Sequence, residues 1–444
     1  MKVGLITAIR EDFFNPYEIK IKTTMPNLAL LYLSGYLEKK GLECEVLIED
    51  KFEKLAKERP DILGISSITE NFQHAIHLAM RARKLWNPMI IIGGVHVTSL
   101  PHVLPKVFDV AVIGEGEETF FELLSLYNKH QKLDSSWLSQ IKGITYHEGA
   151  ETVFTGFRKG ISNLDEIPAP DRRLFGIKYP YTYMMTSRGC PYTCSFCVIP
   201  HVSEGYRMHS AEYVIEEIKQ IKEVKPNPRK VRIFDDLYIV NKKRTHEIAE
   251  RVHAEGLDQE FDFSCWVRAN LLDKEVVQSL KKMNMKYVEF GAESGSSKVF
   301  SEIKPGCGMD DNQKAIDILY DNGFYTSCSI LIGHPLETES DLIATYEFIE
   351  RNVDKLFSVE FNNAIPWPGT DLWDYAKKQG WARDDMDFGI LRECVHFPNY
   401  STKKYPYLNK NISPERYESI LTKFHELFWK FEEKQKEIEA FLAW

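Results

Sequence analysis

The 444-residue sequence lacks long hydrophobic runs and has no excess of basic residues. No stretch approaches the roughly 18 uninterrupted apolar residues of a transmembrane helix, so we expect no membrane span. The N-terminal apolar run is also too short for the core of a signal peptide. The net charge of −9 argues against general nucleic-acid binding, which needs basic stripes over the phosphates.

Cysteine is scarce, with eight residues in the whole chain. Five of them are scattered, at Cys44, Cys265, Cys307, Cys328 and Cys394. Such scattering is not a disulfide framework, so the sequence is typical of a reduced, cytoplasmic protein. The other three lie together in the stretch SRGCPYTCSFC, and their spacing requires a separate explanation.

What is present in the first part of the chain is an alternation of β-branched runs with helical patterns. We expect strands at Val3–Thr7, Cys44–Ile48, Ile62–Ser66, Ile90–Gly93 and Val110–Ile113, with helices such as Asn27–Lys40 and Asn71–Leu85 between them. This order predicts a doubly wound, flavodoxin-like parallel sheet. Ligands of such sheets bind beyond the carboxyl ends of the strands, where the loops SSITENF, GGVHVTSLP and GEGEET fall here.

The βα alternation resumes after a hairpin that turns at Glu148 and Gly149 and a proline-bearing connector. We expect six further strands, at Tyr183–Ser187, Val231–Phe234, Phe261–Cys265, Tyr287–Phe290, Thr326–Ile332 and Val359–Ala364. They predict a partial (β/α)6 barrel of the TIM type, with its chemistry at the carboxyl ends of the strands.

We therefore expect a domain at 1–140, a hairpin and linker at 141–180, the barrel at 181–380 and a helical extension at 381–444. The extension contains an amphipathic helix over Ser413–Trp444.

The three clustered cysteines, Cys190, Cys194 and Cys197, directly follow a predicted strand. A structural zinc ion takes four ligands, and His201 is a nominal fourth. Iron–sulfur clusters are held by thiolates. Three thiolates on a four-iron cluster leave one iron open for a substrate or cofactor, so the missing fourth cysteine favours an iron–sulfur site.

This motif, with Phe196 before its last cysteine, resembles the signature of the radical SAM superfamily. The resemblance implies a [4Fe–4S] cluster whose open iron binds S-adenosylmethionine (SAM). One electron from an external reductant of the flavodoxin or ferredoxin type then cleaves SAM to methionine and a 5′-deoxyadenosyl radical. The cofactors carry this chemistry, while the protein orients and secludes them.

Several later stretches resemble the SAM-contacting strands of the same family. The candidates follow the second, third and fourth barrel strands and are Asp235, Asp236, Arg268, Glu293 and Ser294. Arg268 is a candidate carboxylate clamp because its guanidinium is a fork of donors. Acidic residues at strand ends are also common as helix caps, so each position alone is a weak signal.

The first part of the chain is similar to the cobalamin-binding domain that is fused to many radical SAM enzymes. The candidate cofactor residues lie in the three loops, at Thr69, Gly93, Gly94, His96, Gly114, Glu115 and Gly116. Glycines allow the close backbone approach that a large flat corrin needs. The D-x-H-x-x-G motif of some cobalamin proteins is absent after the first strand, so the resemblance implies binding without a histidine lower ligand. The alternative is a flavodoxin-like domain that binds nothing.

Together these resemblances imply a cobalamin-dependent methyltransferase that acts on an unactivated carbon or phosphorus of a small molecule, lipid or natural-product precursor. The alternative is a radical SAM cyclase, oxidoreductase or rearrangement enzyme. A methylthiotransferase does not fit, because it would need three further cysteines in the N-terminal half, where only Cys44 is present.

Overall fold

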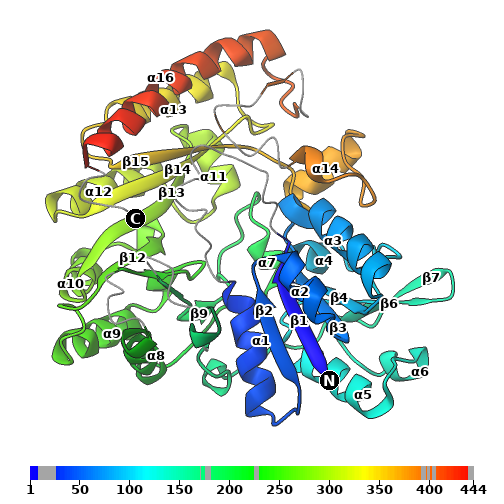
Figure 1. The fold of residues 1–444 in the computed structure, drawn as a ribbon. Coiled ribbons are helices and arrows are strands. Elements are labelled where there is room, and N and C mark those ends of the chain that lie inside the picture. The colour runs from blue at the N-terminus through cyan, green and yellow to red at the C-terminus, as the bar shows by residue number, and fades with distance from the viewer. Residues whose placement is uncertain are drawn as a thin grey trace. The chain divides into compact units, whose positions relative to one another are not determined.

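The computed structural model describes residues 1–8, 27–170, 172–175, 182–224, 230–391, 397, 401–402 and 407–438. The chain divides into two compact units, and each is described by itself (Figure 1). The first unit comprises Met1–Tyr179, His201–Glu204 and Ala382–Arg392, and the second comprises Pro180–Pro200, Gly205–Trp381 and Glu393–Trp444. Within the described ranges, no helix is long and apolar enough to cross a membrane.

A seven-stranded sheet with the order β2-β1-β3-β4-β5-β6-β7 forms the centre of the first unit. Its strands are β1 (Lys2–Thr7), β2 (Glu45–Glu49), β3 (Ile62–Ser66), β4 (Met89–Gly93), β5 (Val110–Val112), β6 (Ile144–Glu148) and β7 (Glu151–Phe154). The first five strands are parallel in the flavodoxin-like order, which confirms the predicted fold class. The predicted hairpin continues this sheet, because β6 pairs antiparallel with β5.

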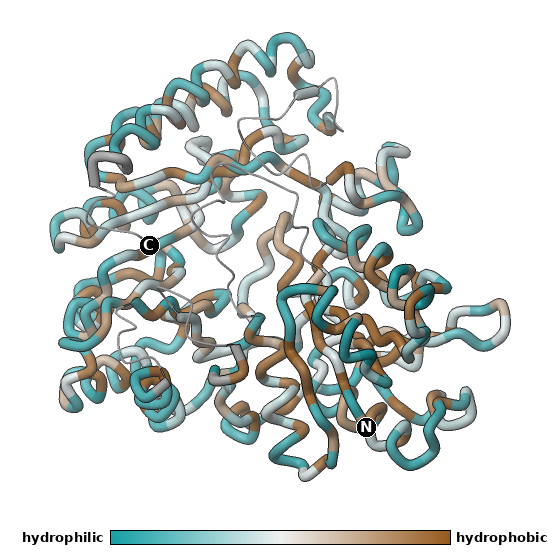
Figure 2. The backbone as a smooth tube through the Cα atoms, viewed as in Figure 1, coloured by the Kyte–Doolittle hydropathy of each residue, from teal (hydrophilic) through white to brown (hydrophobic). Residues whose placement is uncertain are grey.

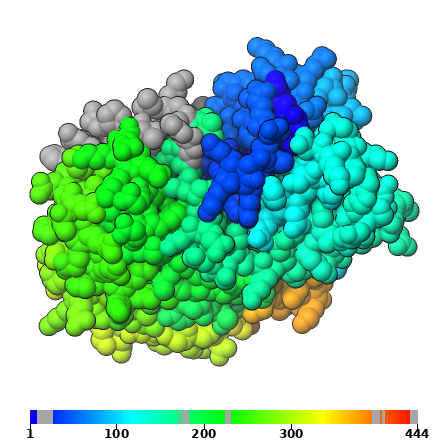
Figure 3. Space-filling model, turned by 90° about the horizontal axis from the view of Figure 1, so that it is seen from below, coloured from blue at the N-terminus to red at the C-terminus, as the bar shows by residue number. Residues whose placement is uncertain are grey.

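Helices cover this sheet through apolar stripes. The helices are α1 (Leu28–Lys39), α2 (Phe52–Glu58), α3 (Phe72–Leu85), α4 (Val95–Ser99), α5 (Glu117–His130) and α6 (Ser135–Leu138). Helix α1 begins where the Asn27 side chain accepts a hydrogen bond from the backbone of Ala29 at 3.0 Å. Leu30 and Leu37 of α1 share a buried cluster with Phe120 of α5. Figure 3 shows the blue surface around α1 beside the cyan surface around α5.

A six-stranded parallel sheet with the order β15-β14-β13-β12-β11-β8 forms the second unit. Its strands are β8 (Thr182–Met184), β11 (Lys230–Ile233), β12 (Asp262–Val267), β13 (Met285–Glu293), β14 (Tyr325–Ile332) and β15 (Ser358–Asn363). Each strand pairs with its neighbour in this sequence, and β8 and β15 form the two edges. This is the arrangement expected of the partial barrel.

The first barrel strand is shorter than predicted. Instead of one strand over Tyr183–Ser187, β8 ends at Met184, and β9 (Ser187–Arg188) pairs antiparallel with β10 (Arg207–Met208). The backbone N–H groups of Thr186 and Ser187 donate to a buried carboxylate, which bends the chain out of the ladder.

Most helices of the second unit pack on its sheet through one buried cluster, namely α8 (Ala211–Val224), α9 (Lys242–Ala254), α10 (Lys274–Lys282), α12 (Met309–Asp321), α13 (Glu339–Glu350) and α16 (Pro414–Ile438). The chain also forms α7 (Ile199–Val202), which spans the division between the two units, and α11 (Ser297–Ile303) and α14 (Asp371–Lys378) of the second unit. Figure 2 shows apolar and polar residues alternating along α16, and its buried residues include Tyr417, Phe424 and Leu427. Helix α16 therefore closes the core against α13 and β15, as Figure 1 shows, and residues 439–444 of the predicted helix lie outside the described range.

Candidate functional site

A cavity of about 410 Å³ lies at the carboxyl ends of the strands in the second unit. Cys190, Cys194 and Cys197 all line it, and so does Phe196. Of the predicted SAM-contacting residues, Asp236, Arg268 and Glu293 also line it. The structure thus brings together in one cavity residues that are spread over more than 100 positions of the sequence.

The cysteine loop is attached to the wall of this cavity. The Ser195 backbone N–H donates to the carbonyl of Ile303 at 3.1 Å, and the Cys197 N–H donates to the carbonyl of Cys194 at 3.0 Å. Phe196 packs against Val299, Ile303 and Leu331. The aromatic residue of the motif therefore anchors the loop, which keeps the cysteines on either side of it directed at the cavity.

The chemistry of the three cysteines fits an iron–sulfur cluster. All three are free thiols and are partly buried. Burial raises the pKa of Cys190, and it raises the pKa of Cys197 to about 12. Cys190 and Cys197 are therefore protonated at neutral pH in the absence of metal, and iron binding must displace their protons. The Arg268 guanidinium, with Nη1 3.5 Å from Cys194 Sγ, supplies positive charge beside the resulting thiolates.

Asp235 supports the cysteine loop from beneath instead of lining the cavity. Its carboxylate is 2% exposed and accepts four hydrogen bonds. The backbone and hydroxyl of Thr186 donate at 2.5 and 2.6 Å, and those of Ser187 donate at 3.1 and 2.6 Å. Buried Arg244 holds the same turn through the carbonyl of Thr186 at 2.6 Å. The predicted SAM contact at Asp235 is therefore occupied by the protein itself.

Replacing Asp235 by Asn tests this supporting role. An amide has one acceptor oxygen, so two of the four donors lose their partner, and leaving buried donors unsatisfied costs roughly 1–3 kcal/mol. We expect the free energy of unfolding, measured with urea, to fall by about that amount. The control is Asp321→Asn at an exposed position of the same unit. A normal stability with a selective loss of SAM affinity would instead mean that Asp235 contacts SAM.

Asp236 lies one position further along and does face the cavity. Its Oδ2 accepts a hydrogen bond from the backbone of Gly189 at 3.1 Å, directly before the first cysteine. Burial and the neighbouring charge of Asp235 raise its pKa to about 6. Asp236 therefore joins the end of β11 to the start of the cysteine loop.

Arg268 crosses the cavity wall after β12. Its Nη2 donates to the carbonyl of Pro305 at 2.5 Å, and its Nε donates to Asn270 at 3.1 Å. The guanidinium also lies over the ring of Tyr192, 4.0 Å from the ring centroid, within the cysteine loop. Arg268 is thus held in one orientation beside the cysteines.

Glu293 and Ser294 follow β13 but have different surroundings. Glu293 forms a buried ion pair with Lys304 at 3.0 Å, and its backbone has a left-handed φ of 57°. A strained non-glycine residue at a cavity wall is a common feature of functional sites. Ser294 is fully buried and hydrogen-bonds to Thr345 at 3.2 Å, so it stabilises the turn instead of lining the cavity.

The sequence analysis did not predict several other residues that line the cavity, among them Tyr192, Trp266 and Lys304. Trp266 could have been found, because it lies two positions before Arg268 at the end of β12, and residues two apart along a strand face the same side. No local sequence pattern indicates that Lys304 belongs to the site, because its ion pair with Glu293 is formed only in the folded structure.

In the first unit, the loops after β3, β4 and β5 are joined into one edge. The Ser67 N–H donates to the carbonyl of Gly93 at 2.9 Å. Thr98 donates to the carbonyl of Gly94 at 2.9 Å and accepts from the backbone of Gly114 at 3.0 Å. The predicted cofactor loops therefore form a single hydrogen-bonded ridge at the carboxyl edge of the sheet.

His96 is part of the core behind this ridge. Its ring stacks on Phe72 at 3.7 Å and meets Phe388 edge-on at 4.5 Å between centroids, and its Nδ1 lies 3.2 Å from the hydroxyl of Thr69. Burial lowers the pKa of His96 to about 3, so the ring is neutral at physiological pH. His96 and Thr69 therefore take part in the packing of the first unit.

The glycines of the ridge differ in how much room they leave. A Cβ on Gly94 would lie 2.2 Å from the carbonyl oxygen of Ser67, and a Cβ on Gly116 would lie 3.2 Å from Leu33. A Cβ on Gly114 would meet no atom within 4 Å, and one on Gly93 would meet only Val112 at 3.9 Å. Gly114 therefore borders open space, Gly93 has room for ordinary contact with Val112, and Glu115 beside them is partly buried.

Comparison with known proteins identifies the family of both parts of the chain. The family model of the radical SAM superfamily matches residues 184–349, and that of the B12 binding domain matches residues 16–124. A protein of Pyrococcus horikoshii described as an uncharacterized methyltransferase is 33% identical over 395 residues, which cover 85% of this chain and 84% of that protein. The chain belongs to the radical SAM superfamily.

Other relatives of this radical SAM chain include named enzymes. An anaerobic magnesium-protoporphyrin IX monomethyl ester cyclase of Cereibacter sphaeroides is 26% identical, over 81% of this chain and 62% of that protein. The hopanoid C-3 methylase of Methylococcus capsulatus is 25% identical, over 77% of this chain and 66% of that protein.

The fold is also found in solved structures. The radical SAM methyltransferase TsrM of Kitasatospora setae, with cobalamin and a [4Fe–4S] cluster bound, superposes with a TM-score of 0.74 at 15% identity and covers 96% of this chain and 88% of its own. These findings confirm the predicted enzyme class and fold, with a [4Fe–4S] cluster, SAM and cobalamin as the cofactors.

Proposed function

We propose that this radical SAM enzyme transfers a methyl group to an unactivated carbon or phosphorus of a small molecule or lipid. The observation that carries the proposal is the presence, in one chain, of a three-cysteine cavity and a B12-binding unit whose loop edge has open glycine positions. When bound, the cluster supplies the electron that splits SAM, and cobalamin carries the methyl group.

The residues of the second unit have three tasks in this proposal. Cys190, Cys194 and Cys197 bind three irons of the cluster and leave the fourth for SAM. Arg268 and the Glu293–Lys304 pair present fixed charges of both signs to the same cavity, which suits the carboxylate and amino groups of SAM. Indole side chains of Trp266 and Trp367 line the cavity and exclude water from it.

In the first unit, Gly93, Gly114 and Glu115 are the positions that would lie against the corrin. Gly94, Gly116, Thr69 and His96 support that surface from behind through the contacts described above. We also propose that the enzyme works in the cytoplasm with a flavodoxin- or ferredoxin-type reductant, because the cluster cysteines must stay reduced in order to bind iron.

The reaction is tested with SAM that carries an isotope in its methyl group. The enzyme, reconstituted anaerobically with iron, sulfide and hydroxocobalamin, is incubated with a small-molecule and lipid extract of the source organism. We expect both 5′-deoxyadenosine and S-adenosylhomocysteine to accumulate and the label to enter one product. Mass spectrometry follows all three, and a Cys194→Ala variant is the blank.

The result that would overturn methyl transfer is equally specific. If 5′-deoxyadenosine forms without S-adenosylhomocysteine and the product stays unlabelled, the enzyme is a cyclase or rearrangement enzyme. This second outcome is included because the chain is also similar to a protoporphyrin ester cyclase.

A further inference from the structure

A basic pocket lies between α9 and α10 of the second unit, outside the cysteine cavity. It is open, has a volume of about 1060 Å³, and is lined by five lysines and two glutamates. The lysines are Lys242, Lys243, Lys274, Lys281 and Lys282. This excess of positive charge stands on a chain whose net charge is −9.

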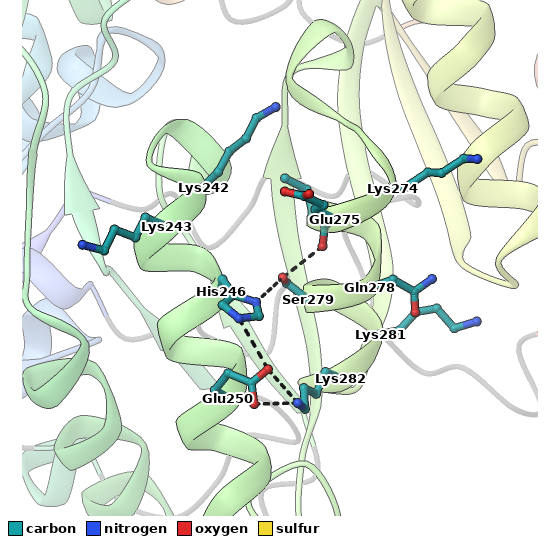
Figure 4. A pocket seen from close by; sticks show the side chains of 11 residues that line it. Lys242, Lys243, His246, Glu250, Lys274, Glu275, Gln278, Ser279, Lys281 and Lys282 are labelled. Atoms are coloured by element: carbon teal, nitrogen blue, oxygen red, sulfur yellow. Dashed lines mark hydrogen bonds and ion pairs between the residues drawn. The ribbon is translucent and has the colours of Figure 1, made fainter.

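The charge of this basic pocket is only partly neutralised. Lys242 pairs with Asp273 at 2.6 Å, and Lys282 pairs with Glu250 at 2.5 Å. Among the described residues, no carboxylate forms an ion pair with Lys243, Lys274 or Lys281, and all three are exposed. In Figure 4 the amino group of Lys243 extends from α9 on one side of the pocket and those of Lys274 and Lys281 extend from α10 on the other, while dashed interactions connect His246, Glu250, Ser279 and Lys282 between the two helices.

The pocket begins a short distance along the chain from the cysteine cavity. Leu237 and Arg268 line that cavity, and Lys242 and Lys274 follow them by five and six positions. Even a fully extended chain spans at most about 18 Å and about 22 Å over those lengths. Arg268 itself contacts Cys194 at 3.5 Å. A partner seated at this end of the pocket is therefore close to the cluster.

We propose that the basic pocket is the docking surface for an acidic one-electron carrier protein. The inference rests on the proposed function, since the cluster must receive an electron. In the encounter the reduced carrier loses one electron and the cluster gains it, so no other reactant is needed. Uncompensated lysines would steer an acidic carrier by long-range attraction, which raises association rates by 10- to 1000-fold at low salt.

Charge reversal tests the surface without knowledge of the substrate. The probe is a fully reduced, acidic flavodoxin, mixed anaerobically with the SAM-bound enzyme, and bleaching of the cluster absorbance gives the second-order rate constant. We expect the triple variant Lys243→Glu/Lys274→Glu/Lys281→Glu to lower this rate constant by about tenfold or more at low ionic strength. The difference should shrink as salt is added, because salt screens exposed charges.

The matched control is Lys314→Glu/Lys378→Glu/Lys430→Glu, which makes the same charge change at exposed lysines elsewhere in the unit. Photoreduced deazaflavin, a small donor without a docking surface, should reduce all three proteins equally. Equal rates for the two triple variants with flavodoxin would overturn the proposal, and so would tight RNA binding that only the pocket variant loses. The iron content of the wild-type protein is measured first. If the wild-type protein binds no cluster, the proposed function is wrong, independently of the docking surface.

Discussion

Replacing Cys190, Cys194 or Cys197 by Ala is expected to abolish both the cluster and SAM cleavage. Each thiolate binds one iron, and a methyl group in its place leaves that iron without its protein ligand. We expect iron content after anaerobic reconstitution to fall from four per chain to near zero, with loss of the brown absorbance and of 5′-deoxyadenosine formation.

The control for this loss is Cys307→Ala in the same unit. Cys307 is also a partly buried free thiol, and burial raises its pKa as well, but it is not a wall residue of the cavity. Its variant should keep iron, sulfide and SAM cleavage. Stoichiometric zinc without iron in the wild-type protein would contradict the cluster assignment and return the motif to the alternative of a structural zinc site.

Substitutions at two neighbouring glycines distinguish an effect on cobalamin binding from an effect on the stability of the first unit. A Cβ on Gly93 has only ordinary contact with Val112 at 3.9 Å, so Gly93→Phe at the end of β4 should allow the unit to fold but leave it with little cobalamin. Gly94→Ala places a Cβ 2.2 Å from the Ser67 carbonyl at a φ of 113°, so it should destabilise the unit by about 2–4 kcal/mol.

Two measurements distinguish these effects. Cobalt content and the absorption spectrum after reconstitution report cobalamin, and urea unfolding reports stability. The cluster in the second unit should remain at full iron content in Gly93→Phe. A Gly93→Phe protein with wild-type cobalamin content would mean that the corrin does not lie against the end of β4, and a wild-type protein that retains none would favour a domain that binds nothing.

The sequence by itself determined those features that depend on local spacing or periodicity. The three cysteines lie within eight positions after a strand, so their joint role as ligands follows without a fold. The alternation of strands and helices predicted both parallel sheets, because hydrophobic period and connection length decide strand direction. From that direction, the loops at the carboxyl ends of the strands could be chosen as the candidate sites.

Only the tertiary structure decided which residues at those ends face the cavity. Asp235 and Asp236 are adjacent in sequence, yet one binds the turn 49 positions earlier and the other lines the cavity. The same holds for Gly93 and Gly94, of which only the second has no room for a Cβ beside the Ser67 carbonyl. The basic pocket also exists only because α9 packs on α10. In each case a residue's role depends on partners distant in sequence, and local patterns carry no information about those partners.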